Sequence, residues 1–124
     1  MALKVAVTDS RPFTKTVRLE GKLNNETVGL LDEELTAIVN SPTSVVVFNL
    51  AELDYISSVG LRSLFRIRKI MNERSGKALL VNPTPQVRKV LEIVNAVDVA
   101  SVFASVEELD RYLDTMQRKV AGGE

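Results

Sequence analysis

Several residue types that carry enzyme chemistry are missing from this chain. Its 124 residues include no cysteine and no histidine. Without cysteine the chain has no disulfide, no thiol nucleophile and no thiolate metal site. Without histidine it lacks the commonest general base, the commonest metal ligand and any phosphohistidine relay. A Ser/His/Asp triad is therefore excluded, and we expect no enzyme, no metal site and no cofactor.

The chain also has no charge imbalance and no long hydrophobic run. Lys plus Arg and Asp plus Glu both number 16, which argues against a nucleic-acid partner bound through bulk positive charge. No apolar stretch approaches the length that crosses a bilayer, and Met1–Lys4 lacks the apolar core of a signal peptide. We therefore expect a cytoplasmic protein without direct membrane insertion.

What is present suits one ordinary globular domain. Apolar residues make up 45% and charged residues 26% of the chain, which is usual for a soluble protein. A chain of this length has room for a core of its own. We expect a single domain over residues 1–124, with a frayed tail at 119–124.

The stretch from Ser44 to Arg62 organises the predicted fold. Val45–Phe48 is an unbroken run of β-branched and aromatic residues, typical of a central strand covered on both faces. Asn49 interrupts this run, and four apolar residues then predict a connection anchored on the core: Leu50, Leu53, Tyr55 and Ile56. From Leu61 onward, apolar residues recur at helical spacing.

Ser57 and Ser58 stand where this strand gives way to the helix, at an edge where ligands and partners usually dock in open α/β sheets. A structural interpretation is that one serine caps the helix, a common role for Ser. A functional interpretation is that the other serine points outward as a phosphorylation switch, because free N–H groups and the helix dipole favour a phosphate there. Gly60 would then let a partner approach closely.

The segments before this stretch predict a hairpin and a loop. Leu3–Thr8 and Thr14–Glu20 alternate apolar and polar residues, which is typical of a β-hairpin, with Gly21 ending its second strand. A polar loop follows over Lys22–Thr27. We expect this loop to lie beside the start of the helix at Ser58, because both are at the same end of the sheet.

Helical spacing of apolar residues predicts four helices. Their buried stripes are Leu30, Leu31, Leu35, Ile38 and Val39; Gly60, Leu61, Leu64, Ile67 and Met71, in a helix from about Ser58 to Glu73; Val87, Val90, Leu91 and Val94; and Leu109, Tyr112, Leu113 and Met116. Thr84-Pro85 is a start signal for the third helix, which Asn95 closes, and Ser105–Glu108 is a capping box for the last. Short strands are expected over Ala78–Val81 and Ser101–Ala104. The order ββαβαβαβα predicts an α/β fold in which the hairpin gives one antiparallel edge strand and each later strand joins in parallel.

Two other kinds of α/β site are not supported. The glycines are scattered and build no phosphate loop of the form G-x-x-x-x-G-K. A response-regulator receiver domain would need paired acids after its first strand, an aspartate ending the third and a lysine ending the fifth. Here Asp9 stands alone, Asp54 lies several residues past its strand, and Ser101–Ala104 has no lysine.

Three segments share their pattern with one known protein family. Asn49–Arg62 reads NLAELDYISSVGLR, close to the signature L-x-x-L-x-x-[ΦD]-S-S-x-G-L that joins a strand to a helix. Leu19–Asn24 is similar to L-x-G-E-L-D, and Pro83–Leu91 to S-P-x-V-x-R-x-L. In this order the segments resemble the STAS domain family, most closely its bacterial anti-sigma-factor antagonists. The resemblance covers nearly the whole chain and implies a STAS-like mixed β-sheet with helices packed mainly on one side.

The resemblance also implies a function, which is partner switching. An unphosphorylated antagonist binds an anti-sigma factor that is also a serine kinase of the histidine-kinase-like ATPase type, and so releases the sigma factor. The kinase then phosphorylates a serine at the start of the second helix, and a serine phosphatase restores binding. Alignment on Gly60-Leu61 places that serine at Ser58. The partner surface that the resemblance implies comprises Asn24, Asn25, Glu26, Asp54, Ser57, Ser58, Val59, Gly60 and Arg62.

Three positions depart from the family pattern. Ser57 stands where an aspartate often precedes the phosphorylated serine, and Lys22 and Asn24 replace the glutamate and the aspartate of G-E-L-D. A second interpretation, of a different class, is a STAS subunit that binds without phosphorylation in a transport complex or a signalling scaffold. The retained serine and the length of the chain favour the phosphoregulated antagonist.

Overall fold

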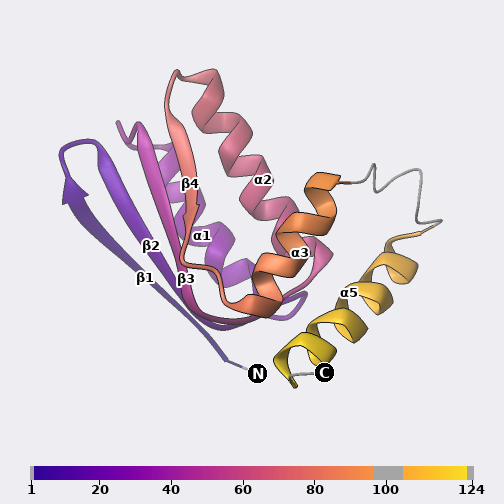
Figure 1. Cartoon of the computed structure of the whole chain (residues 1–124). Coiled ribbons are helices and arrows are strands. Elements are labelled where there is room, and N and C mark those ends of the chain that lie inside the picture. The colour runs from indigo at the N-terminus through magenta and orange to yellow at the C-terminus, as the bar shows by residue number, and fades with distance from the viewer. Residues whose placement is uncertain (1, 97–104, 123–124) are drawn as a thin grey trace.

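The computed structural model describes residues 2–96 and 105–122, with only the backbone described at Ala96 and Val106. Its elements are, in order, β1 Leu3–Arg11, β2 Thr14–Leu23, α1 Val28–Val39, β3 Val45–Ile56, α2 Ser58–Glu73, β4 Lys77–Val81, α3 Pro85–Ala96 and α5 Val106–Ala121 (Figure 1). The strand predicted over Ser101–Ala104 lies outside the described residues. α5 continues as far as Ala121, into the segment 119–124 that the sequence predicts to fray.

The described strands form one mixed sheet in the order β1-β2-β3-β4. β1 pairs with β2 antiparallel, whereas β2 pairs with β3, and β3 with β4, in parallel. The predicted hairpin with its antiparallel edge strand is therefore confirmed, as are the parallel connections through α1 and α2.

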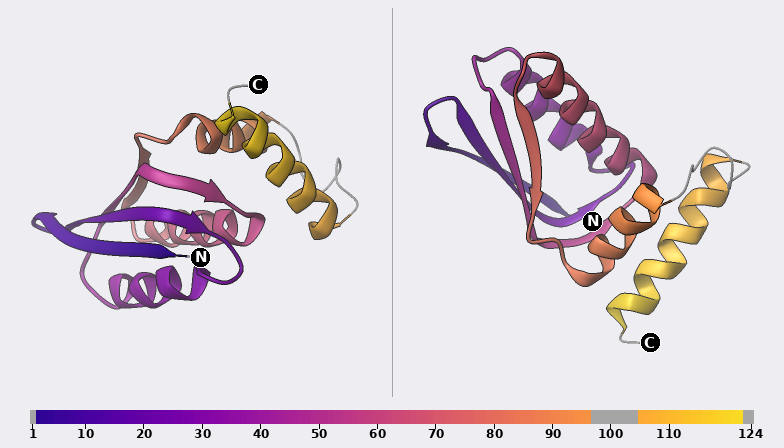
Figure 2. Two further views of the ribbon diagram at one scale, coloured as in Figure 1. Left: turned by 90° about the horizontal axis from the view of Figure 1, so that it is seen from below. Right: turned by 45° about the horizontal axis from the view of Figure 1, so that its top comes forward.

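One face of the sheet carries the core. Alternate residues of the two central strands are fully buried there, among them Val17, Leu19, Val46 and Phe48. The residues between them, such as Arg18, are exposed or half-buried. α1 and α2 lie side by side on the buried face, so helices do pack mainly on one side, but the expectation that β3 is covered on both faces is wrong (Figure 2). α3 and α5 lie beside each other at the end of the sheet where β3 and β4 finish.

β3 is longer than the sequence predicts. It runs for twelve residues, and the segment after Asn49 that was expected as a connection is strand. Pairing with β2 continues to the partners Leu23 and Ile56, with shifts of register on the way. These shifts let Leu50 and Leu53 bury in spite of the exposed residues between them. As a result, the strand delivers the chain directly to the start of α2.

Gly21 lies inside β2 and does not end it. Its φ is +112°, in a region that residues with a side chain rarely adopt. A Cβ here would collide with the carbonyl oxygen of Ala2, while the next N–H, that of Lys22, donates to the same oxygen at 3.2 Å. β2 therefore continues to Leu23, and the polar loop predicted over Lys22–Thr27 is shortened to the four residues that follow.

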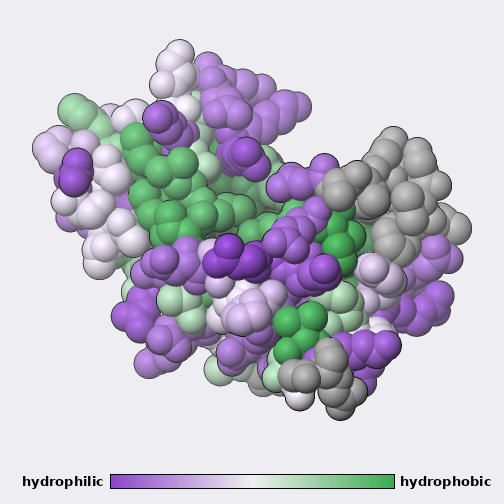
Figure 3. Space-filling model, viewed as in Figure 1, coloured by the Kyte–Doolittle hydropathy of each residue, from purple (hydrophilic) through white to green (hydrophobic). Residues whose placement is uncertain are grey.

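Two residues of the predicted buried stripes are exposed: Leu30 of α1 is 50% exposed and Tyr112 of α5 is 46% exposed. Leu79, in the predicted strand over Ala78–Val81, is 44% exposed. β4 lies at the far edge of the described sheet, and the space-filling view shows an apolar area over this strand (Figure 3). All five predicted stripe positions of α2 are buried: Gly60, Leu61, Leu64, Ile67 and Met71.

α3 begins at Pro85 as predicted but continues through Ala96, so Asn95 does not close it. The hydroxyl of Thr84 donates to the carbonyl oxygen of Leu53 at 2.8 Å, which ties the start of α3 to the last part of β3. Among the described helices, none combines the length and the apolar character needed to span a membrane.

Candidate functional site

Ser57 fixes the start of α2. It is the single residue between β3 and α2, and its extended backbone is typical of an N-cap. Its Oγ accepts a hydrogen bond from the N–H of Gly60 at 3.3 Å, and its own N–H donates to the carbonyl oxygen of Leu23 at 2.9 Å. The prediction that one of the two serines caps the helix is confirmed, and Ser57 is that residue.

Gly60 has a different role from the expected one. It is buried, and a Cβ at this position would lie 2.7 Å from Cγ of Leu23 and 3.1 Å from Cγ1 of Ile56. Glycine is therefore needed so that the first turn of α2 can pack on the ends of β2 and β3. The expectation that Gly60 leaves room for an approaching partner is wrong.

Ser58 is the first residue of α2 and does not point outward. The residue is only 8% exposed, and among the described residues its Oγ has no hydrogen-bond partner. A buried hydroxyl without a partner is unusual and costs free energy. The prediction that the second serine faces solvent is therefore wrong.

α5 contacts the junction between β3 and α2 through side chains on one helical face. Oδ1 of Asp110 accepts the backbone N–H of Ser58 at 3.0 Å. The side-chain amide of Gln117 accepts the N–H of Ile56 at 3.0 Å and donates to the carbonyl oxygen of the same residue at 2.8 Å. Leu113, which lies between them along the helix, is fully buried.

The sequence analysis missed this contact. Ser105 caps α5 as predicted, with its Oγ accepting the N–H of Glu108 at 3.1 Å, and the apolar stripe through Leu113 was found. The available signal was the spacing of two polar residues, since Asp110 and Gln117 share the face of Leu113 at positions i−3 and i+4. Polar side chains on an apolar helical face indicate hydrogen bonds to buried polar groups of another element.

The loop after β2 is held by its own hydrogen bonds. Oδ1 of Asn24 accepts the N–H of Glu26 at 2.9 Å and that of Thr27 at 3.2 Å. The hydroxyl of Thr27 donates to the carbonyl oxygen of Lys22 at 2.7 Å, and its oxygen accepts the N–H of Asn24 at 3.0 Å. Asn24 is thus part of the loop's own structure, while Asn25 and Glu26 are exposed.

The loop and the start of α2 border one hollow. Its volume is about 400 Å³, and its lining comes from β2 and the loop, the end of β3, the helix cap and α5: Lys22, Asn24, Asn25, Glu26, Tyr55, Ser57, Asp110 and Asp114. The structure therefore places the loop beside the start of α2, as the sequence predicts, and adds two carboxylates from α5.

Asp110 and Asp114 of α5 form an acidic wall of the hollow. Burial raises the pKa of the Tyr55 phenol above its ordinary value, and the negative charges of Asp114 and Asp110 raise it further. Nζ of Lys22 lies 5.7 Å from the ring centroid of Tyr55. In the described part of the chain, no three acidic side chains come together as a metal site requires.

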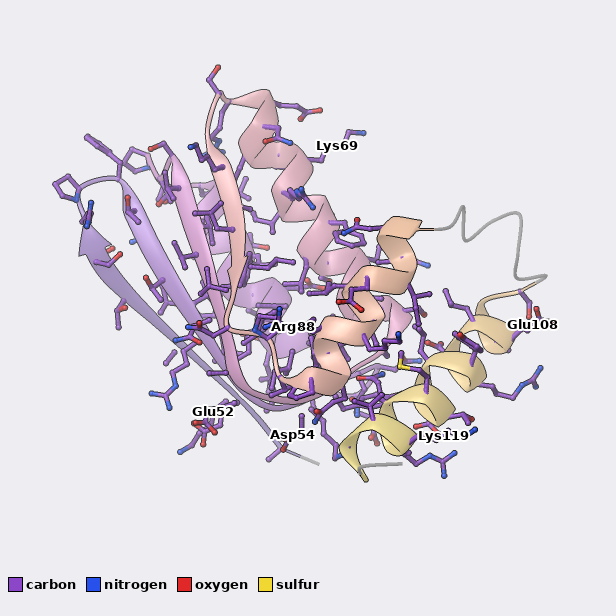
Figure 4. The ribbon with its side chains drawn as sticks, in the orientation of Figure 1. Glu52, Asp54, Lys69, Arg88, Glu108 and Lys119 are labelled. Atoms are coloured by element: carbon purple, nitrogen blue, oxygen red, sulfur yellow. The ribbon has the colours of Figure 1, made fainter. Side chains whose placement is uncertain are left out.

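Three other predicted partner residues lie around this region. Asp54 is exposed and lies with Glu52 at the lower edge of the molecule, and its carbonyl oxygen accepts the side-chain amide of Gln86 at 3.0 Å (Figure 4). Arg62 is exposed one turn into α2, and Val59 is half-buried. All three are near the start of α2 in the chain, but none of them lines the hollow.

Comparison with known proteins places this geometry in context. The STAS domain family matches residues 5–109. BtrV of Bordetella bronchiseptica, which is named as an anti-sigma factor antagonist, is 36% identical over 89 residues, covering 72% of this chain and 77% of that protein.

Solved structures are similar to the fold as a whole. The anti-sigma factor antagonist SpoIIAA in its unphosphorylated form has a TM-score of 0.68 at 20% identity, over 74% of this chain and 81% of that chain. The Bacillus cell fate determinant SpoIIAA in the phosphorylated form has a TM-score of 0.64 at 20% identity, over 73% and 83%. The family match, the relative in Bordetella and the shared fold agree, and the chain belongs to the STAS domain family.

Proposed function

We propose that this protein is an anti-sigma-factor antagonist that works by partner switching. In its unphosphorylated form it binds an anti-sigma factor that is also a serine kinase of the histidine-kinase-like ATPase type. Phosphorylation of Ser58 ends the complex, and a serine phosphatase restores binding. The protein itself is a binding module, without catalytic residues.

One observation carries the proposal. Ser58 is the first residue of α2 and lies directly after the helix cap, next to a hollow bordered by the loop Asn24–Thr27. The first turn of a helix presents backbone N–H groups and the positive end of the helix dipole, which favour a phosphate once Asp110 has left the N–H of Ser58. A relative named as an anti-sigma factor antagonist and a structural neighbour solved both with and without phosphorylation support the same proposal.

Release follows from the charge that phosphorylation adds. A phosphate brings about −1.5 to −2 charges at neutral pH. A partner surface shaped for a hydroxyl holds no counter-charge for it, so the complex would have to bury a solvated dianion at a cost of several kcal/mol. The domain keeps its fold, because the helix terminus stabilises the same charge.

The test is to incubate the purified chain with a candidate kinase and ATP, and to map the phosphopeptide by mass spectrometry. We expect a single added phosphate that Ser58→Ala abolishes and Ser57→Ala retains. Ser57→Ala is the matched control, because it changes the neighbouring serine and leaves the acceptor in place. Phosphate on Ser57, or on Thr8, Thr14 or Thr27 instead, contradicts the assignment.

The burial of Ser58 favours a second candidate function. A residue that is 8% exposed is a poor kinase substrate as it stands, and a STAS subunit that binds without phosphorylation would have no need of an accessible serine. Such a subunit would bind its partner and take up no phosphate under conditions in which the kinase phosphorylates a known substrate.

A further inference from the structure

We propose that α5 is an intramolecular lid over Ser58, which covers this residue in the unphosphorylated chain and must move before a kinase or a partner can reach it. The biological meaning of the lid rests on the proposed function, because that function makes Ser58 the switch. The existence of the lid depends only on the contacts of α5.

The first step of the argument is what α5 holds. Asp110 and Gln117 bind backbone groups of Ser58 and Ile56, the residues on either side of the helix cap. These two side chains therefore attach α5 to the backbone at the junction between β3 and α2. Figure 2 shows α5 lying beside α3 as a separate outer helix, so it can move away without breaking a pairing between the described strands.

The second step is that the closed arrangement carries a cost. The Oγ of Ser58 is buried with no hydrogen-bond partner in the described part of the chain. Water would satisfy this hydroxyl as soon as α5 moved away, so the closed arrangement is less stable than one in which the lid bonded the hydroxyl. The unpaired hydroxyl therefore shifts the equilibrium between the closed and the open lid toward the open state.

The third step is charge. Asp110 places a carboxylate oxygen 3.0 Å from the backbone nitrogen of Ser58. It therefore occupies the position at the start of α2 where a phosphate on the same residue would seek the helix N–H groups. Asp114 follows one turn later on the wall of the same hollow. A phosphate on Ser58 would be repelled by both carboxylates, so the phosphorylated chain should keep the lid open.

The fourth step is where these residues lie. The STAS family match ends at residue 109. Asp110, Leu113 and Gln117 all follow that point. These three residues lie outside the matched segment, and we assign the lid to this chain alone.

The experiment uses the absence of cysteine. Ser58→Cys introduces one thiol, and its rate of reaction with an aromatic disulfide reagent reports how often the lid opens. Ser10→Cys, in the exposed hairpin, gives the rate of an open position, and Ser63→Cys, 6% exposed on α2, gives the rate of a site buried away from α5. We expect the thiol at position 58 to react at least roughly a hundredfold more slowly than the thiol at position 10.

Opening the lid should then accelerate this one site. Adding Gln117→Ala, or Asp110→Asn, to Ser58→Cys should raise the rate by roughly tenfold, since each removes buried hydrogen bonds of α5. Thr115→Ala, an exposed change on the same helix, is the matched control and should leave the rate unchanged. In the Ser63→Cys chain, the lid variants should have no effect.

Three results would overturn the proposal. One is a thiol at position 58 that reacts as fast as the thiol at position 10. Another is a folded Gln117→Ala chain with an unchanged rate at position 58. The third is equal acceleration at positions 58 and 63, which would mean that α5 stabilises the whole fold. No kinase or partner enters the assay, so a protected thiol in a chain that takes no phosphate would retain the lid and reject the proposed function.

Discussion

Two segments border the hollow at the start of α2, and they are held in different ways. The loop Asn24–Thr27 is held by hydrogen bonds between residues no more than five apart in the chain. α5 is held by hydrogen bonds that reach 52 and 61 residues back to Ser58 and Ile56. Local bonds persist while their own turn persists, whereas side-chain contacts between distant elements are lost together when one element moves. The loop is therefore a preformed edge of the hollow, and α5 is a removable one.

The largest effect should come from a charge placed between the two segments. Ser58→Asp adds a carboxylate opposite Asp110 and at the expected partner surface. We expect affinity for the anti-sigma factor to fall roughly tenfold or more, because that charge has no counter-charge in the complex. Ser58→Ala should bind at least as tightly as the wild type and should not respond to the kinase. Isothermal titration calorimetry measures both affinities.

The control for this prediction is thermal unfolding. Ser58→Ala should unfold near the wild-type temperature. Ser58→Asp should stay folded but melt at a lower temperature, because its carboxylate repels Asp110 of α5 although the start of α2 favours a negative charge. A Ser58→Asp chain that binds as tightly as the wild type contradicts the electrostatic explanation. So does one that loses binding only because it has melted.

The next effect tests whether the loop is preformed. Thr27→Val keeps the shape of the side chain but removes the bonds to Lys22 and Asn24, both made by a residue that is 3% exposed. We expect the free energy of unfolding in urea to fall by about 1–3 kcal/mol. Thr36→Val, on the exposed side of α1, is the control and should change it by about 0.5 kcal/mol or less. Equal effects of the two substitutions would show that the loop bonds of Thr27 stabilise the fold no more than an exposed hydrogen bond does.

A smaller effect should separate binding from stability within the loop. Asn25→Ala changes an exposed residue and should weaken partner binding by roughly a few-fold, with the melting temperature within a degree or two. Asn24→Ala should weaken binding and also lower the melting temperature, because its side chain accepts two loop N–H groups. Unchanged affinity for both variants by calorimetry would remove the loop from the interface.

The smallest effect concerns the acidic wall of the hollow. Burial first, and then Asp114 and Asp110, raise the pKa of Tyr55, so Asp114→Asn should lower that pKa toward its ordinary value. Absorbance at 295 nm follows the titration in a Tyr112→Phe background, which removes the second tyrosine. Because the folded-state pKa is the higher one, the stability that Tyr55 contributes is fully present below its unfolded pKa of 10.0 and is lost as the pH rises through the folded value. An Asp114→Asn chain with an unchanged titration would place α5 away from Tyr55.

Local signals predicted much of this fold. The hairpin, the bounds of α2 and its buried stripe, and the capping of α5 by Ser105 follow from alternation, helical spacing and cap residues within a few positions. The same local signals place the cap of α2 at one of two serines, Ser57 or Ser58. These features depend on neighbours in the chain, which a sequence displays directly.

What the sequence did not predict depends on distant partners. β3 continues past Asn49 because β2 stays paired with it, and the register shifts that allow this pairing leave no plain mark in β3 itself. Ser58 is buried, and a helix that begins 48 residues later returns to accept its backbone N–H. Gly60 is needed for contact with Leu23, which lies in another strand. In each case the missing information is a contact between elements that periodicity cannot report.

The bridge from Gln117 to Ile56 has a consequence for how a complex could form. β4 leaves β3 after Asn49, so among the described strands the last part of β3 has a neighbour on the β2 side only. There the primary amide of one side chain imitates a peptide group: it offers one donor and one acceptor to the two backbone groups of a single residue. An extended segment of another protein offers the same pair. Replacing the amide of Gln117 by a peptide group of another protein conserves the number of hydrogen bonds. The end of β3 can therefore exchange its contact with α5 for a contact with a partner without leaving the backbone groups of Ile56 unpaired.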